Sequence, residues 1–157
     1  MKRTIDPLSE LLSPDAIRPI EQMSMPYLGY YLLRETLTRR LLGESEAPIL
    51  YWTGKELGDQ IVIDSAEDLV MTFIRLGLGK LEVLEQHQQL VRFGLQHSSY
   101  ALIPVERLTQ MLSLEAGLLA GAIGAWRDQP AQAGLEIHQR SGKKPEALIT
   151  VRLQPME

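Results

Sequence analysis

Four stretches of the chain place apolar residues three or four positions apart, which is the repeat of one face of an α-helix. Most of these stretches begin at a proline or a capping residue, and glycine follows two of them as a helix stop. Ser65, with Asp68 three residues later, has the spacing of a capping box and marks the start of the third helix. The predicted helices cover residues 27–42, 48–60, 65–76 and 111–126.

In four other stretches the repeat shortens from 3.6 residues to two, which is typical of strands with one buried face. Ile149, Val151 and Leu153 show this alternation clearly. Residues 98–110 fit either a loop containing Pro104 or a short helix over the sheet. The predicted strands cover residues 80–86, 90–97, 133–139 and 147–153.

The order of these elements, α-α-α-β-β-α-β-β, predicts an α/β fold of the α+β kind, in which a four-stranded antiparallel sheet packs against helices. A length of 157 residues is that of one domain, which we expect over residues 26–157. Prolines at positions 7, 14 and 19 break regular structure before it. We therefore expect residues 1–25 to form an N-terminal arm, either loosely ordered or packed on a neighbour.

The helix predicted over residues 111–126 is apolar on all sides, so we expect it to be buried on both faces. Small residues, including Gly117 and Gly121, gather on one side and allow another element to approach closely. Gly54, in the stripe of an earlier helix, also indicates a close approach of backbones. Glu115 is the only charged residue between Met111 and Trp126. Its position in the first turn favours a structural role at the positive end of the helix dipole.

The helix predicted over residues 27–42 carries more apolar surface than one core can cover. We therefore expect a homodimer that uses this helix and part of the next one. Trp52, on a charged side of the next helix, is expected either under a loop or against a partner. The residues predicted at the dimer interface are Tyr27, Tyr30, Tyr31 and Leu33.

The composition excludes several kinds of chemistry. The chain has no cysteine, which removes disulfides, thiolate metal sites and cysteine nucleophiles. Sixteen basic against twenty acidic residues give a net charge of −4, which argues against a nucleic-acid or anionic-membrane partner. The uncharged run 116–126 is too short to span a bilayer, and no apolar segment follows Lys2 and Arg3 as in a signal peptide. We expect a cytoplasmic protein.

Motifs for cofactors, metals and nucleophilic catalysis are also missing. The three histidines lie far apart in the sequence, and neither a Walker loop nor a complete dinucleotide fingerprint occurs. No catalytic residue, metal site or cofactor is therefore predicted. The basic pairs Arg39-Arg40 and Lys143-Lys144 are isolated in the sequence, and we interpret them as solvated surface rather than as a track for phosphates.

Two segments, Tyr51-Trp52-Thr53-Gly54-Lys55-Glu56-Leu57 and Leu114-Glu115-Ala116-Gly117-Leu118-Leu119-Ala120, resemble the signature segments of the YslB-like family of uncharacterised bacterial proteins. Gly77-Leu78-Gly79, leading into a hairpin, also fits this family. The family is similar to the wider superfamily of TRAPP-complex small subunits and four-vinyl-reductase domains. The resemblance covers about residues 26–155. It implies a TRAPP-subunit-like sandwich that dimerises through its helices, and it leaves non-covalent binding of an apolar ligand open.

These observations favour a non-enzymatic binding or scaffold protein, homodimeric, with a pocket for an apolar small molecule between the helix 111–126 and residues 98–110. A well-packed core without a void is the alternative to that pocket. A subunit of a heteromeric assembly, or a hydrolase-type enzyme using Glu115, would also fit the sequence. The enzyme would need Lys55 or His97 to converge on Glu115. The predicted ligand-binding residues are Gly117, Ala120, Gly121 and Tyr100.

Overall fold

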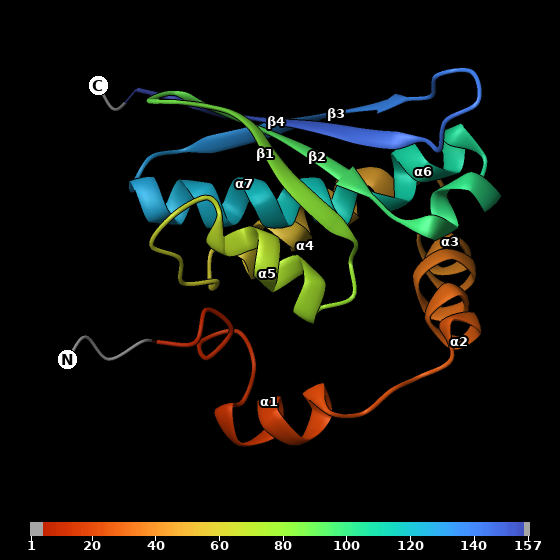
Figure 1. Cartoon of the computed structure of the whole chain (residues 1–157), viewed down its shortest axis with the longest axis horizontal. Coiled ribbons are helices and arrows are strands. Elements are labelled where there is room, and N and C mark those ends of the chain that lie inside the picture. Colours follow the sequence, from red (N-terminus) through yellow and green to blue (C-terminus); the bar gives the residue numbers. More distant parts are fainter. Residues whose placement is uncertain (1–4, 156–157) are drawn as a thin grey trace.

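A computed structural model describes residues 5–155, and its framework is a four-stranded antiparallel sheet with helices on one face (Figure 1). The strand order is β1-β2-β4-β3, so the last strand of the chain lies between β2 and β3. Phe93 is paired with Ile149 and with Val83, which places these apolar side chains on the face that the helices cover. The predicted fold class is confirmed. The strands are β1 (Lys80–His87), β2 (Leu90–Gln96), β3 (Ala131–His138) and β4 (Glu146–Leu153).

The helices predicted from the sequence are all present, with three differences. The third begins at Asp68 rather than Ser65, because the Asp68 carboxylate accepts the backbone N–H groups of Asp64 (2.8 Å) and Ser65 (3.2 Å) and holds a turn there. The first is π-helical in its middle, and residues 98–110 form two short helices. The helical elements are α1 (Pro14–Glu21), α2 (Tyr27–Tyr31), the π-helix η1 (Leu32–Leu37), α3 (Thr38–Leu42), the 3-10 helix η2 (Gly43–Ser45), α4 (Glu46–Gly58), α5 (Asp68–Arg75), the 3-10 helix η3 (Ser98–Leu102), α6 (Val105–Met111) and α7 (Ser113–Arg127).

The segment expected as a loosely ordered arm contains α1, which lies below the other helices in Figure 1. Leu8 is buried in the core, and the Pro7 carbonyl accepts a hydrogen bond from the Val62 N–H (2.9 Å). Arg75 of α5 binds the carboxylates of both Asp6 (2.9 Å) and Glu21 (2.6 Å). These hydrogen bonds lower the pKa of both carboxyls. Residues 1–4 of the expected arm lie outside the described residues.

Helix α7 is the centre of the core, between the sheet and α4 (Figure 1). Its large side chains, such as Leu119 and Ile123, are fully buried. Its small residues face α4 so closely that there is no room for a side chain. A Cβ atom at Gly121 would lie 2.7 Å from the Asp59 nitrogen, and one at Gly117 would lie 2.9 Å from the Lys55 nitrogen. The predicted close approach of two backbones is therefore present.

One helical stretch, Val105–Arg127, is long and apolar enough by composition to cross a membrane. The uncharged run considered in the sequence was only part of it. In the fold it is divided at Leu112 into α6 and α7, and 67% of its most apolar window is buried inside the protein. Its apolar character is accounted for by the core that it fills.

Candidate functional site

The continuous helix α2–η1–α3 turns charged side chains toward the body of the protein. From η1, the Arg34 guanidinium donates to the Glu115 carboxylate (2.6 Å), the Met111 carbonyl (3.2 Å) and the Tyr30 hydroxyl (3.0 Å). Glu115 lies in the first turn of α7 and is only 2% exposed. Burial lowers the pKa of Arg34, but the Glu115 carboxylate, together with the neighbouring Tyr30 and Tyr100, raises it overall. The expected structural role of Glu115 thus includes an ion pair with a basic side chain.

A second buried ion cluster lies beside the first. Arg107 of α6 binds Glu35 of η1 (2.8 Å) and, with two nitrogens, the Glu46 carboxylate (2.8 and 3.0 Å). Glu46 is fully buried and Glu35 is 5% exposed. Hydrogen bonds to Glu46, and then to Glu35, raise the pKa of Arg107 against the effect of burial. Buried charges are tolerated only when they are paired, so the two clusters fix the helix in one orientation on α6 and α7.

While Arg34 and Glu35 point inward, the same helix exposes apolar side chains along with Arg39 and Arg40. Leu28 is 79% exposed, Leu41 is 72% exposed and Leu32 is 55% exposed. A π-helical segment such as η1 is rare, and it changes the direction in which the following side chains point. We call the exposed set the apolar surface of α2–α3. Its members are Tyr27, Leu28, Tyr31, Leu32, Leu33, Leu37 and Leu41.

Three of the four residues predicted at a dimer interface belong to this surface, since Tyr27, Tyr31 and Leu33 are all exposed. Tyr30 does not belong to it. Its ring packs on the core, and burial raises the pKa of its hydroxyl to about 12. The sequence pattern had placed all four together because it could not show which side of the helix the body would cover.

Of the four residues predicted to line an apolar pocket, Ala120 and Gly121 lie together at one cleft, and Gly117 and Tyr100 are not among the residues that line it. Gly117 and Gly121 contact the α4 backbone, which occupies the volume that the pocket required. Tyr100, in η3, packs against the His97 ring, with 5.8 Å between ring centroids. The Tyr100 hydroxyl is buried and has no hydrogen-bond partner within residues 5–155. Ala120 is fully buried beside Gly121.

The cleft that Ala120 and Gly121 line is open, has a volume of about 480 Å³ and lies between α4 and the turn after α7. Trp52 lies at this cleft and is 60% exposed, with the Lys55 ammonium 5.1 Å from its ring centroid. The exposed position matches the second of the two expectations for Trp52, a residue available to a partner. Lys55 is thus engaged with Trp52 rather than with Glu115.

Arg34 forms an ion pair with Glu115, and the charge of Glu115 also acts on His97, where it opposes the larger effect of burial on the pKa. His97 uses its Nδ1 atom to accept the Ser99 N–H (3.0 Å), and its ring stacks on Tyr27. Burial lowers the pKa of His97. Among the described residues, the ion-pair partner of Glu115 is Arg34. A guanidinium stays protonated at any physiological pH, so an Arg–Glu pair holds charge and geometry but does not exchange a proton.

Sequence reasoning missed four residues of these clusters: Arg34, Glu35, Glu46 and Arg107. Arg34 and Glu35 directly follow the apolar first half of the helix, and this abrupt change was a usable signal of a polar contact. Glu46 and Arg107 lie in polar surroundings in the sequence and gave no such signal. They are 61 residues apart and meet only through the fold.

Comparison with known proteins places the chain in a family. Residues 27–152 match the family described as "Protein of unknown function (DUF2507)". The chain belongs to the DUF2507 family. A relative, the uncharacterized protein YslB of Bacillus subtilis (strain 168), is 26% identical over 137 residues, which are 87% of this chain and 90% of YslB. The resemblance to the YslB-like family is confirmed.

The fold of this DUF2507 chain is similar to that of a solved protein. The crystal structure of a vinyl-4-reductase family protein from Methanocaldococcus jannaschii matches it with a TM-score of 0.62. The match covers 99% of this chain and 98% of the other, at 20% sequence identity. At that identity the likeness shows a common fold, in agreement with the architecture derived from the sequence.

Proposed function

We propose that this chain is a non-enzymatic binding or scaffold protein that works as a homodimer. The observation that carries the proposal is the orientation of α2–η1–α3, which turns Arg34 and Glu35 inward and its leucines outward. A helix that packs only within its own chain normally buries its leucines, and a contiguous set of exposed leucines is typical of a surface that binds another protein. A helix held on one side by ion pairs and apolar on the other is suited to lie between two bodies.

A second copy of the chain is the partner that we propose. A twofold interface needs only one self-complementary patch, and an apolar helix packing on its own copy meets that condition. The seven side chains of the apolar surface, about half exposed on average, offer an area on the order of the 800 Å² per subunit that a stable dimer buries. Ile49 and Trp52 on α4 are also exposed and extend the apolar area.

The absence of catalysis is part of the same proposal. The buried charged groups of η1, α6 and α7 are arranged as arginine–carboxylate pairs, and both clusters join one helix to another. Such pairs stabilise an arrangement of helices. They do not supply the general acid or base that a hydrolase using Glu115 requires.

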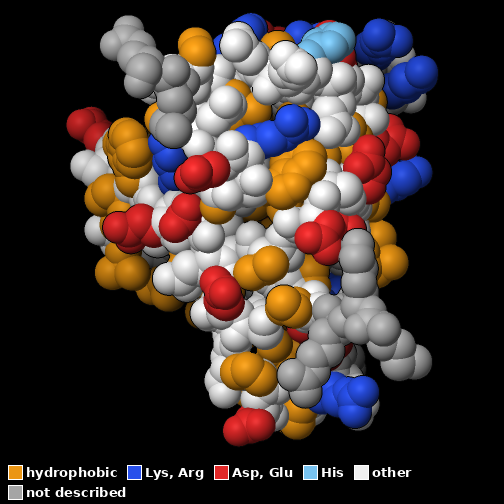
Figure 2. All heavy atoms as spheres, turned by 90° about the vertical axis from the view of Figure 1, so that its left-hand side faces the viewer, with side chains coloured by type: hydrophobic (Ala, Val, Ile, Leu, Met, Phe, Trp, Pro, Cys, Tyr) orange, Lys and Arg blue, Asp and Glu red, His pale blue; other side chains and the backbone are white. Residues whose placement is uncertain are grey.

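Binding of an apolar small molecule is a second candidate function, at a different place from the one expected. A groove of about 360 Å³ lies between α1 and α5, and its size is in the range of small-molecule sites. Hydrophobic side chains reach the surface over this part of the molecule (Figure 2). The apolar residues that line the groove are Leu8, Leu12, Ala16, Ile17, Ile20, Met23 and Leu76.

The test is native mass spectrometry and sedimentation of the purified full chain at about 10 µM, well above the dissociation constant of an ordinary specific dimer. We expect twice the chain mass of 17.7 kDa. Replacing Leu28 and Leu32 together by glutamate should give a monomer with unchanged circular dichroism. Leu84→Glu is the matched control, because Leu84 is 48% exposed on β1, away from α2–η1–α3.

A wild-type monomer at this concentration would refute the homodimer, as would a dimer that the double variant leaves intact. A monomer that enters a larger assembly only with another protein would favour a heteromeric subunit. The same mass spectra report any apolar molecule that co-purifies with the chain. An added ligand mass that is present in the wild type and absent in Ile20→Glu would support ligand binding in the groove between α1 and α5.

A further inference from the structure

The outer face of the sheet is not covered by any helix that the structure describes (Figure 1). A cleft of about 770 Å³ lies at one end of this face, where β1 begins and where β3 and β4 are joined. Two pairs of neighbouring elements build its walls: the β1 start with the β2 end, and the two ends of the β3–β4 loop. The residues that line it are Lys80, Glu82, Leu84, Gln96, His97, Ser98, His138, Arg140, Lys143, Lys144, Glu146 and Leu148.

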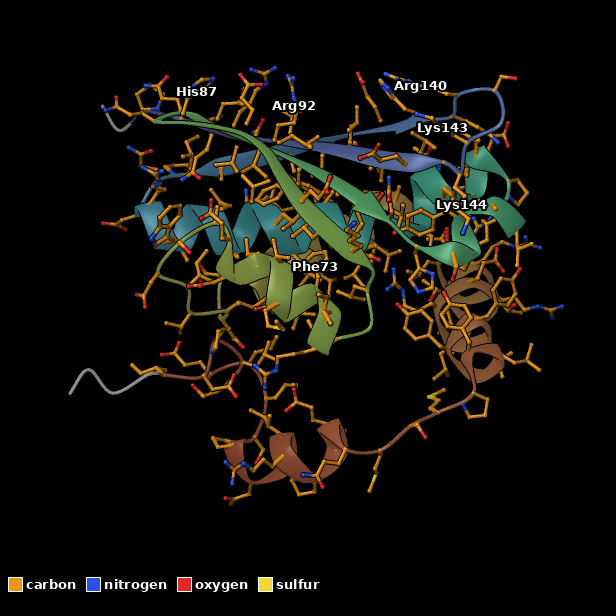
Figure 3. The ribbon with its side chains drawn as sticks, in the orientation of Figure 1. Phe73, His87, Arg92, Arg140, Lys143 and Lys144 are labelled. Atoms are coloured by element: carbon orange, nitrogen blue, oxygen red, sulfur yellow. The ribbon has the colours of Figure 1, made fainter. Side chains whose placement is uncertain are left out.

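Four basic side chains meet at this cleft although they are distant in the sequence. Lys80 is the first residue of β1. Arg140, Lys143 and Lys144 come from the β3–β4 loop and are labelled in Figure 3. The Lys143 N–H donates to the Arg140 carbonyl (2.9 Å), so the loop is folded into a turn. None of the four forms an ion pair with a residue in the range 5–155. Their charges are therefore available to a ligand.

The cleft also contains two carboxylates, Glu82 and Glu146. Four basic side chains against two carboxylates leave an excess of two positive charges, in a chain whose net charge is −4. Glu146 lies over Gly94, whose missing side chain leaves room for the carboxylate on the sheet surface. A carboxylate repels an anion, but it accepts hydrogen bonds from hydroxyl and amino groups. Gln96 and Ser98 add neutral hydrogen-bonding groups.

From this arrangement we propose that the cleft binds a phosphorylated small molecule that also carries hydroxyl or amino groups, of the kind represented by a nucleotide or a sugar phosphate. The phosphate lies toward Lys80 and the β3–β4 loop, and the hydroxyl or amino groups lie toward Glu82 and Glu146. The cations converge on one hollow from two directions, and its volume is within the range of small-molecule sites. An extended acidic peptide would instead need basic residues along a line. This inference is independent of the proposed dimer.

The test is to titrate the full chain with ADP and with inorganic pyrophosphate at fixed ionic strength. Binding is measured by calorimetry and by changes in amide chemical shifts. We expect ADP to bind at concentrations of about 1 mM or below. The largest shifts should fall on β1, the end of β2 and the β3–β4 loop. Lys143→Glu with Lys144→Glu should weaken binding by about tenfold or more, because each phosphate loses a charge-assisted hydrogen bond.

The matched control is Arg18→Glu with Arg40→Glu, which changes the net charge equally at two exposed basic residues that do not line the cleft. Equal weakening in both double variants would mean a general charge effect and would overturn the proposal. Absence of binding by both probes up to about 10 mM, or shifts confined to other surfaces, would also overturn it. Tighter binding of a hexaglutamate peptide than of ADP would assign the cleft to acidic polypeptides instead.

Discussion

The contact between α4 and α7 can be tested with a single methyl group at Gly121. In Gly121→Ala the new carbon would lie 2.7 Å from the Asp59 nitrogen and would also overlap the Lys55 carbonyl. Non-bonded atoms of this kind prefer about 3.5 Å, so the two helices must separate by about 1 Å. Overpacking costs about 1–3 kcal/mol when side chains can yield, and more when only backbone can move. The better helix propensity of alanine returns about 1 kcal/mol.

The expected net effect is a loss of about 2 kcal/mol in the free energy of unfolding, measured by urea denaturation. For a chain of this size it corresponds to a fall in Tm of about 4–8 °C. Gly134→Ala is the matched control, because a Cβ atom there meets nothing within 4 Å. That variant should be neutral or stabilised by up to about 1 kcal/mol, since glycine weakens a strand. A Gly121→Ala protein as stable as the wild type would refute the reasoning.

Two further predictions concern the ion pairs. Glu115→Gln keeps the size of the side chain but removes the charge opposite Arg34, and it should lower the free energy of unfolding by about 1.5–3 kcal/mol in urea. An unchanged urea midpoint would contradict the structural role of Glu115. Because the hydrogen bond from Arg75 lowers the pKa of Glu21, the last residue of α1, in the folded protein, this contact stabilises α1 above the unfolded pKa of about 4.3 and is lost as the pH falls through the folded pKa. The rate of amide hydrogen exchange in α1 should therefore increase in acid, between about pH 4 and 2. The Arg75→Ala substitution should raise this rate at neutral pH as well. If neither acid nor the substitution changes the rate, Arg75 does not hold α1 in place.

The parts of the fold that were predicted correctly depend on patterns local to one segment. The alternation in β4 and the continuous apolar character of α7 indicate which faces are buried, and these patterns can be recognised without knowing any long-range contact. The orientation of α2–η1–α3 could not be predicted in this way. It depends on Arg34 meeting Glu115, 81 residues away, and on Glu35 meeting Arg107, 72 residues away. No local spacing encodes such pairs.

The errors at the candidate sites have the same origin. Small residues at Gly117 and Gly121 showed that something could approach, but not that α4 would approach with its own glycines, Gly54 and Gly58. The expected pocket was therefore already filled by backbone. The interpretation of Lys143-Lys144 as solvated surface agrees with the exposure of both residues, but their isolation in the sequence gave no indication that they border a cleft with other basic residues. Lys80, which borders the same cleft, is more than sixty positions earlier in the chain.

The two segments on which the family resemblance rests are the two sides of one helix crossing. Gly54 and Gly58 of α4 lie against Leu114 and Leu118 of α7, and Gly117 of α7 lies against α4 in return. The crossing is thus a fit in which each half is acceptable only if the other is present, because a side chain added at these glycines would overlap the backbone of the opposite helix. Residues at the crossing are therefore constrained by assembly and are not available for recognition. The binding properties proposed for this chain lie away from the crossing, on the outer face of the sheet and on α2–η1–α3.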